Sequence, residues 1–133
     1  MYLVDTNVLS ELPRPRPEPA VLRWLQQQRA IVVSAVSVEE LAFGVARAPA
    51  GRRPKLTRWL DGLLESAEIV DVSMTIARAA GELRAARESA GRRVAQADML
   101  IAATALVRGL TLATRNVPDF EGSGVALLNP FDK

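Results

Sequence analysis

The chain has 133 residues, of which 49% are apolar and 24% charged, with a formal net charge of +2. It contains neither cysteine nor histidine. The composition is that of an ordinary globular protein, but the missing residues exclude disulfides, histidine-based catalytic triads and ordinary zinc sites. Any hydrolytic chemistry must therefore depend on carboxylates, with a hard cation such as Mg²⁺ or Mn²⁺ as the natural helper.

Apolar runs and helical patterns alternate along the whole chain. In chain order they predict a strand at 2–4, a helix within 5–12, a helix around 21–25, a strand at 30–37, helices at 38–48 and 55–67, a strand at 68–72, helices at 73–91 and 95–109, a strand at 110–114, a loop at 115–120 and a strand at 124–129. Ser37 and Glu40 have the spacing of a capping box, and Gly109 is placed to end its helix.

The predicted strands are continuous apolar runs rather than alternating ones. Such strands are typical of a parallel sheet that helices cover on both faces. We therefore expect an α/β fold, as one domain over residues 1–133. Asp5 interrupts the first apolar run, so no signal peptide is expected, and no apolar stretch is long enough to cross a membrane. These features predict a cytoplasmic protein.

Four acidic residues stand out because they fall at predicted strand ends or in apolar surroundings: Asp5, Glu40, Asp98 and Asp119. Each also has a simpler interpretation, since Asp5 and Asp98 can cap helices, Glu40 can pair with Ser37, and Asp119 can serve a turn. In a parallel α/β sheet, however, the carboxyl edge would gather all four, and this edge is where ligands bind. Carboxylates crowded together repel one another unless a cation holds them.

Arginine supplies nearly all of the positive charge, with fifteen arginines against two lysines. Guanidinium groups match phosphate geometry well, although codon bias in the genome explains the count equally well. Basic side chains that can follow a nucleic-acid backbone, or simply form solvated loops, are Arg52, Arg53, Lys55, Arg58, Arg92 and Arg93. Arg115 lies beside the predicted site and is the better candidate for a phosphate contact. Trp24 and Trp59 lie on apolar helix faces and are expected in the core or in a dimer interface.

Four segments, in this order, carry a family resemblance: "LVDTNVLSE", "SVEELAFGV", "AQADMLIAATA" and "LATRNVPDFEGSGV". Together they resemble the PIN domain family in its VapC/FitB-like branch of toxin ribonucleases. The resemblance implies a three-layer sandwich with a five-stranded parallel sheet of order 3-2-1-4-5. It also implies a Mg²⁺- or Mn²⁺-dependent endoribonuclease that acts as the toxin of a type II toxin–antitoxin pair.

The resemblance also assigns residues to the site. Asp5, Glu40 and Asp98 match the first three acidic positions of the family, with Asp5 and Asp98 as the principal metal ligands. At the fourth position Asn116 stands where some members carry an acid, and Asp119 follows three residues later. Residues that would support the ligands or touch substrate, or merely cap helices, are Thr6, Asn7, Thr114, Arg115 and Asn116. Water activated by the metal would attack the phosphorus. The resemblance does not identify which carboxylate accepts the proton.

The partners that the resemblance implies are an RNA substrate, a second copy of the chain, and a VapB-like antitoxin that covers the acidic pocket. DNA would be reached only through the antitoxin, and no membrane is expected. Two alternatives remain: a catalytically silent PIN fold that binds RNA or protein, and a Mg²⁺ phosphatase. The phosphatase is weakened because Asn7 stands where its second aspartate would be.

Overall fold

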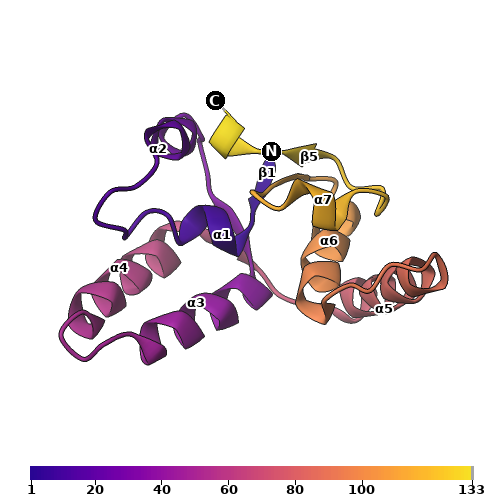
Figure 1. Ribbon diagram of the computed structural model, residues 1–133, viewed down its shortest axis with the longest axis horizontal. Coiled ribbons are helices and arrows are strands. Elements are labelled where there is room, and N and C mark those ends of the chain that lie inside the picture. The colour runs from indigo at the N-terminus through magenta and orange to yellow at the C-terminus, as the bar shows by residue number, and fades with distance from the viewer. Residues whose placement is uncertain (133) are drawn as a thin grey trace.

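A five-stranded sheet runs through the centre of the computed structural model, which describes residues 1–132 (Figure 1). The strands are β1 Tyr2–Val4, β2 Val32–Ser34, β3 Glu68–Val70, β4 Thr111–Ala113 and β5 Leu127–Leu128. They pair in parallel in the order β3-β2-β1-β4-β5. The predicted α/β fold, its parallel sheet and its strand order are confirmed.

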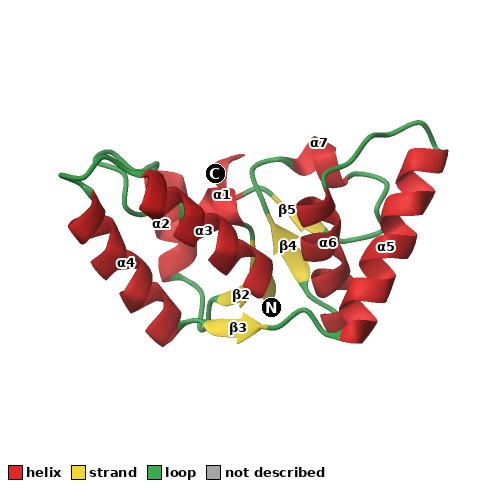
Figure 2. Cartoon of the chain, turned by 90° about the horizontal axis from the view of Figure 1, so that it is seen from below, coloured by secondary structure: helices red, strands yellow, loops and turns green. Residues whose placement is uncertain are grey.

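Helices flank the sheet on both sides, as Figure 2 shows. In chain order they are α1 Thr6–Leu9, α2 Pro19–Gln26, α3 Ala35–Arg47, α4 Arg53–Ser66, α5 Met74–Ser89, α6 Gln96–Arg108, α7 Val117–Phe120 and the short 3-10 helix η1 Pro130–Asp132. The helices α1 to α4 lie on one side of the sheet, and α5, α6 and α7 lie on the other (Figures 1 and 2). Within residues 1–132 no helix combines the length and the apolar character that crossing a membrane requires.

The core consists of two apolar clusters, one on each face of the sheet, because successive strand residues point to opposite faces. Leu3 and Val32 pack towards α5 and α6, whereas Val4 and Val33 pack towards α1 to α4. Trp24 belongs to the second cluster and meets the ring of Tyr2 edge-on, with ring centroids 5.1 Å apart. The expected core position of Trp24 is confirmed. Strands buried on both faces explain why the sequence shows continuous apolar runs there.

The boundary between β2 and α3 differs from the prediction. The strand ends at Ser34, whose hydroxyl caps α3 by accepting from the Val36 N–H at 3.0 Å. The predicted N-cap role of Ser37 is therefore wrong, and Ser37 lies inside α3. A buried, β-branched run does not reveal where strand changes to helix, because both elements are covered on this side. The predicted loop at 115–120 likewise contains the one-turn helix α7.

The end of α6 supplies a stability prediction. Gly109 is the C-cap of α6 and has a φ of 65°, a left-handed conformation that glycine adopts without steric cost. We expect Gly109→Ala to lower the free energy of unfolding by about 1 kcal/mol in a urea titration. The matched control is Gly62→Ala on α4, where a Cβ meets nothing within 4 Å. This control should raise the free energy of unfolding by about 0.5–1 kcal/mol. Equal effects of the two changes would contradict the role of Gly109.

Candidate functional site

Asp5 lies directly after β1, at the carboxyl edge of the sheet. The register of β1 and β4 places Val4 opposite Ala113, so the residues that follow them meet. Thr114 Oγ1 donates to Asp5 Oδ2 at 2.7 Å, and the Asp5 side chain is only 4% exposed. Asp5 Oδ1 accepts from the Thr6 N–H at 2.7 Å, so Asp5 is also the N-cap of α1. Capping and a place in the site are compatible for this carboxylate.

A polar network joins the turn after β1 to the turn after β4. Asn7 Nδ2 lies 3.3 Å from Asp5 Oδ2 and 3.4 Å from Thr114 Oγ1. The Arg115 N–H donates to Asn7 Oδ1 at 3.1 Å, and the Asn116 N–H donates to Thr114 Oγ1 at 3.0 Å. The polar side chains of Asn7 and Thr114 thus orient the Asp5 carboxylate from two elements that are distant in sequence.

The side chains of Arg115 and Asn116 are exposed. The guanidinium of Arg115 lies over the ring of Phe131, 4.7 Å from its centroid. Asn116 is the N-cap of α7 but makes no capping hydrogen bond with its side chain. These two predicted residues therefore contribute to the network through their backbone N–H groups.

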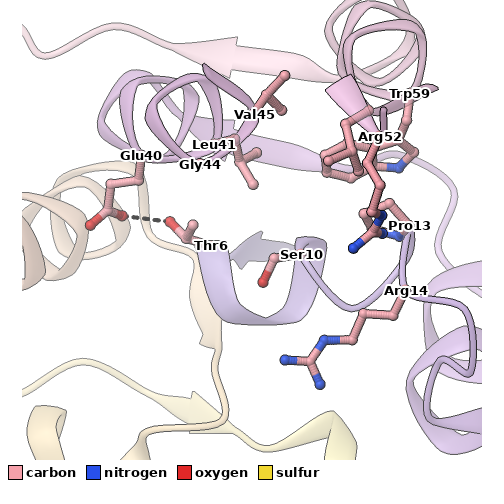
Figure 3. A pocket seen from close by; sticks show the side chains of 11 residues that line it. Thr6, Ser10, Pro13, Arg14, Glu40, Leu41, Gly44, Val45, Arg52 and Trp59 are labelled. Carbon is pink, nitrogen blue, oxygen red and sulfur yellow. Dashed lines mark hydrogen bonds between the residues drawn. The ribbon is translucent and has the colours of Figure 1, made fainter. Parts of the chain in front are cut away.

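Glu40 is held by Thr6, across the gap between α3 and α1. Thr6 Oγ1 lies 2.6 Å from Glu40 Oε1 (Figure 3). It also lies 2.8 Å from Ser37 Oγ. Ser37 is fully buried, while Glu40 is half-buried. The predicted capping-box pair of Ser37 and Glu40 is replaced by a shared contact with Thr6. The sequence offered no signal for this contact, which joins residues more than thirty positions apart.

Asp98 and Asp119 come from the other side of the sheet. Asp98 lies in the first turn of α6 and is half-buried, but the helix is capped by Ala95 without a side-chain hydrogen bond. The helix-cap interpretation of Asp98 is therefore wrong. Asp119 lies in the first turn of α7 and is exposed. Both carboxylates are thus accessible, and they line the same pocket.

Burial is the largest cause that raises the pKa of Asp98, followed in order by the negative charges of Asp5, Asp119 and Glu40, and together they bring it to about 6. This set of causes agrees with the predicted gathering, which stays a prediction, because like charges act on a pKa only when they lie near one another. Three acids, from the end of β1, from α3 and from α7, thus act on the carboxyl group of Asp98 in α6.

The pKa of Asp5 is also raised, chiefly because burial disfavours its charged form. The negative charge of Glu40 adds to this effect. The hydrogen bonds from Thr114, Thr6 and Asn7 oppose it, with the Thr114 bond the strongest of the three. The raised pKa shows that burial outweighs the three donors and disfavours the charged form of Asp5 where no cation is near.

The donor chemistry of this cluster fits a hard divalent ion. Among residues 1–132 no three Asp, Glu, His or Cys side chains converge closely enough to hold one metal ion. The carboxylates influence one another through charge at longer range. Some of them would therefore bind an ion directly, and others would bind it through water. Oxygen donors alone suit Mg²⁺ or Mn²⁺, which retain several waters in protein sites.

Two pockets flank the cluster. One, of about 230 Å³, is lined by Arg92, Arg93, Val94, Ala95, Asp98 and Asp119. The other, of about 250 Å³, lies between α1, α3 and α4, with Glu40 beside apolar side chains such as Leu41 and Val45 (Figure 3). Ser10 also lines this second pocket, one helical turn after Thr6. The sequence predictions did not include Ser10, although residues four positions apart on a helix share a face. Trp59 lies at its edge, partly buried against the core.

The fold and the carboxylates together define an α/β protein with an acidic site at the carboxyl edge of a parallel sheet. The model of the PIN domain family matches residues 2–118, which is most of the chain. The chain belongs to the PIN domain family, and its relatives there are VapC and FitB proteins.

Two relatives and two solved structures match nearly the whole chain. VapC ribonuclease Y4jK from Sinorhizobium fredii is 36% identical, with 99% of each chain aligned. Toxin FitB from Neisseria gonorrhoeae is 34% identical over 98% of this chain and 99% of its own. A chain of the crystal structure of FitAcB from that organism superposes with a TM-score of 0.93 over 100% of both chains. A chain of FitAB bound to a DNA fragment superposes with a TM-score of 0.82 at 30% identity, over 98% of this chain and 96% of that one.

The raised pKa of Asp98 gives a prediction for the metal-free protein. Because the folded state holds this proton more tightly than the unfolded state, stability falls as the pH rises from about 4, the unfolded pKa, through the folded pKa of about 6. Asp98→Asn removes this loss, so its stability relative to wild type should increase between pH 4.5 and 7.5 in urea titrations with EDTA. Asp61→Asn, on the exposed face of α4, controls for the lost charge. A difference between Asp98→Asn and wild type that stays constant with pH would contradict the crowding of the acids.

Proposed function

We propose that this chain is a metal-dependent ribonuclease that acts as the toxin of a VapBC-type toxin–antitoxin pair. The observation that carries the proposal is the coupling of four carboxylates, in which Asp5, Glu40 and Asp119 all act on Asp98. The similarity to VapC ribonuclease Y4jK and to toxin FitB over nearly the full chain supports the same function. The reaction is hydrolysis of an RNA phosphodiester bond.

In this proposal Asp5 and Asp98 hold a Mg²⁺ or Mn²⁺ ion, and Glu40 and Asp119 bind it directly or through water. When bound, such an ion lowers the pKa of water and neutralises negative charge that develops at phosphorus. Thr114 and Asn7 keep the Asp5 carboxylate in a fixed orientation, and Thr6 does the same for Glu40. These neutral donors orient the acids without cancelling the charge that an ion needs.

A catalytic role is favoured over a silent RNA-binding one by the charge of the site. An acidic cluster repels the phosphates of RNA unless a cation is present, so a site built only to hold RNA gains nothing from four acids. The absence of histidine from the chain also leaves carboxylates and a metal ion as the means of hydrolysis.

We propose further that an antitoxin covers the acids and links the chain to DNA. The relatives' structures include FitAB bound to DNA, and this supports an indirect route to DNA. The pocket beside Glu40 offers apolar surface next to the acids, which suits a peptide with apolar side chains (Figure 3). A homodimer is part of the same proposal, and exposed apolar side chains such as Phe43 on α3 and Met74 on α5 are available for it.

The proposal predicts metal-dependent cleavage of RNA by the purified protein. A mixed pool of structured RNAs should be cut with Mg²⁺ or Mn²⁺ and left intact with EDTA. Asp5→Asn and Asp98→Asn should each lower the rate at least 100-fold, because each removes a charge from the ion's ligands, while circular dichroism shows them folded. Asp61→Asn should cut like wild type. Metal-dependent RNA binding without cleavage would instead support the silent module, and equal cutting by all variants would identify a contaminating nuclease.

The hydrogen bond from Thr114 to Asp5 supplies a second prediction. Thr114→Val keeps the shape of this fully buried side chain but removes the donor that most strongly opposes the raised pKa of Asp5. Loss of a group that orients a metal ligand typically costs about 10- to 100-fold in metal affinity or activity. We therefore expect cleavage to need more Mg²⁺ for half-maximal rate. Thr104→Val on α6, whose buried hydroxyl donates to the Leu100 carbonyl, is the control and should leave this requirement unchanged.

A further inference from the structure

The turn between α5 and α6 presents two adjacent arginines, Arg92 and Arg93, beside the acidic cluster. The backbone of this turn is fixed, since the Arg92 N–H donates to the Arg87 carbonyl at 2.9 Å and the Gly91 N–H donates to the Glu88 carbonyl at 3.0 Å. Both arginine side chains are exposed. The pair therefore projects from an ordered support.

The same two arginines line the 230 Å³ pocket that contains Asp98 and Asp119. Guanidinium and carboxylate groups that share a pocket would ordinarily form an ion pair. Yet none of the ion pairs within residues 1–132 joins either arginine to either acid. The pocket is thus lined by positive and negative side chains that are not paired with each other.

A phosphodiester chain on a divalent ion has the chemistry that such a pocket accommodates. Its phosphate oxygens suit the fork of a guanidinium, while the cation suits the carboxylates. We propose that Arg92 and Arg93 form a subsite for a backbone phosphate of RNA next to the bond that is cut. This inference rests on the proposed function and adds the residues that position the substrate.

Two other arginines near the site are less suited to this role. Arg115, which the sequence favoured, places its guanidinium over the ring of Phe131 and lines neither pocket beside the acids. Arg53 donates to the Ala48 carbonyl at 2.9 Å, within its own loop. Arg92 and Arg93 are the arginines that share a pocket with Asp98 and Asp119.

The two arginines differ in one contact, and this makes their roles separable. Arg92 Nη2 donates to the Pro118 carbonyl at 3.1 Å, in the helix α7 that carries Asp119. Arg93 has no side-chain hydrogen bond or ion pair within the part of the chain that the structure describes. Arg93 therefore acts on the substrate alone, whereas Arg92 also positions α7 and Asp119.

The test measures RNA binding and cleavage separately on the full chain. Binding of a fluorescein-labelled, random-sequence single-stranded RNA is followed by anisotropy with Ca²⁺ as the divalent ion, between about 50 and 200 mM salt. Loss of one phosphate contact should lower the slope of log affinity against log salt by about 0.7. We expect this change for Arg93→Ala, with affinity about 3- to 10-fold weaker and KM raised to match at unchanged kcat. Arg92→Ala should show the same change in slope and also a lower kcat. Arg93→Lys, which keeps the charge but not the fork, should retain the slope.

Arg78→Ala is the matched control, because Arg78 is an exposed arginine on α5 whose contact is with Glu82 and not with the pocket. It removes the same charge and should leave slope and KM unchanged. An effect of Arg93→Ala no larger than that of Arg78→Ala would overturn the subsite, as would wild-type protein that binds no RNA. If wild type cuts no RNA under any metal but Arg93→Ala still lowers the slope, the ribonuclease proposal fails and the phosphate subsite stands.

Discussion

The parallel pairing of β1 with β4 is the constraint on which the rest of the site depends. With Val4 opposite Ala113, the first residues beyond the two strands are forced together, and these are Asp5 and Thr114. A shift of one residue in this register would turn the Asp5 side chain to the other face and break its bond with Thr114. The helices α1 and α7 begin close to this point, so the same register also fixes Thr6, Asn7 and the start of α7.

The acidic side chains around Asp5 and Thr114 repel one another, and within residues 1–132 no ion pair neutralises this repulsion. Asp5 is buried among neutral donors, Glu40 is bound by a hydroxyl, and Asp98 has no basic partner within residues 1–132. Crowded carboxylates disfavour the folded state at neutral pH, and a divalent ion removes that cost. If the proposed function holds, stability, metal binding and catalysis are therefore linked through the same side chains. In the proposed subsite, the arginines at the α5–α6 turn would offer positive charge to a phosphate and not to the acids.

The sheet and its order were predictable because buried parallel strands have a strong signature, and the four segments of family resemblance supplied the strand order. The acids could be proposed because carboxylates rarely occur at the ends of such strands or in an apolar helix without a reason. Side-chain partners were not predictable. Ser34 rather than Ser37 caps α3, and Thr6 rather than Ser37 contacts Glu40, because these contacts depend on how two elements pack. The direction of the Arg115 side chain depends on Phe131, sixteen residues later, for the same reason.

The most direct test is a titration of the protein with Mn²⁺, in which electron paramagnetic resonance measures the free ion at pH 7.5 without RNA. Wild type and Asp61→Asn should bind Mn²⁺ alike, and added Mg²⁺ should displace it. Asp98→Asn, which we expect to be folded and at least as stable, should bind Mn²⁺ at least tenfold more weakly. Equal binding by Asp98→Asn and wild type would contradict the claim that these crowded carboxylates form a divalent-ion site.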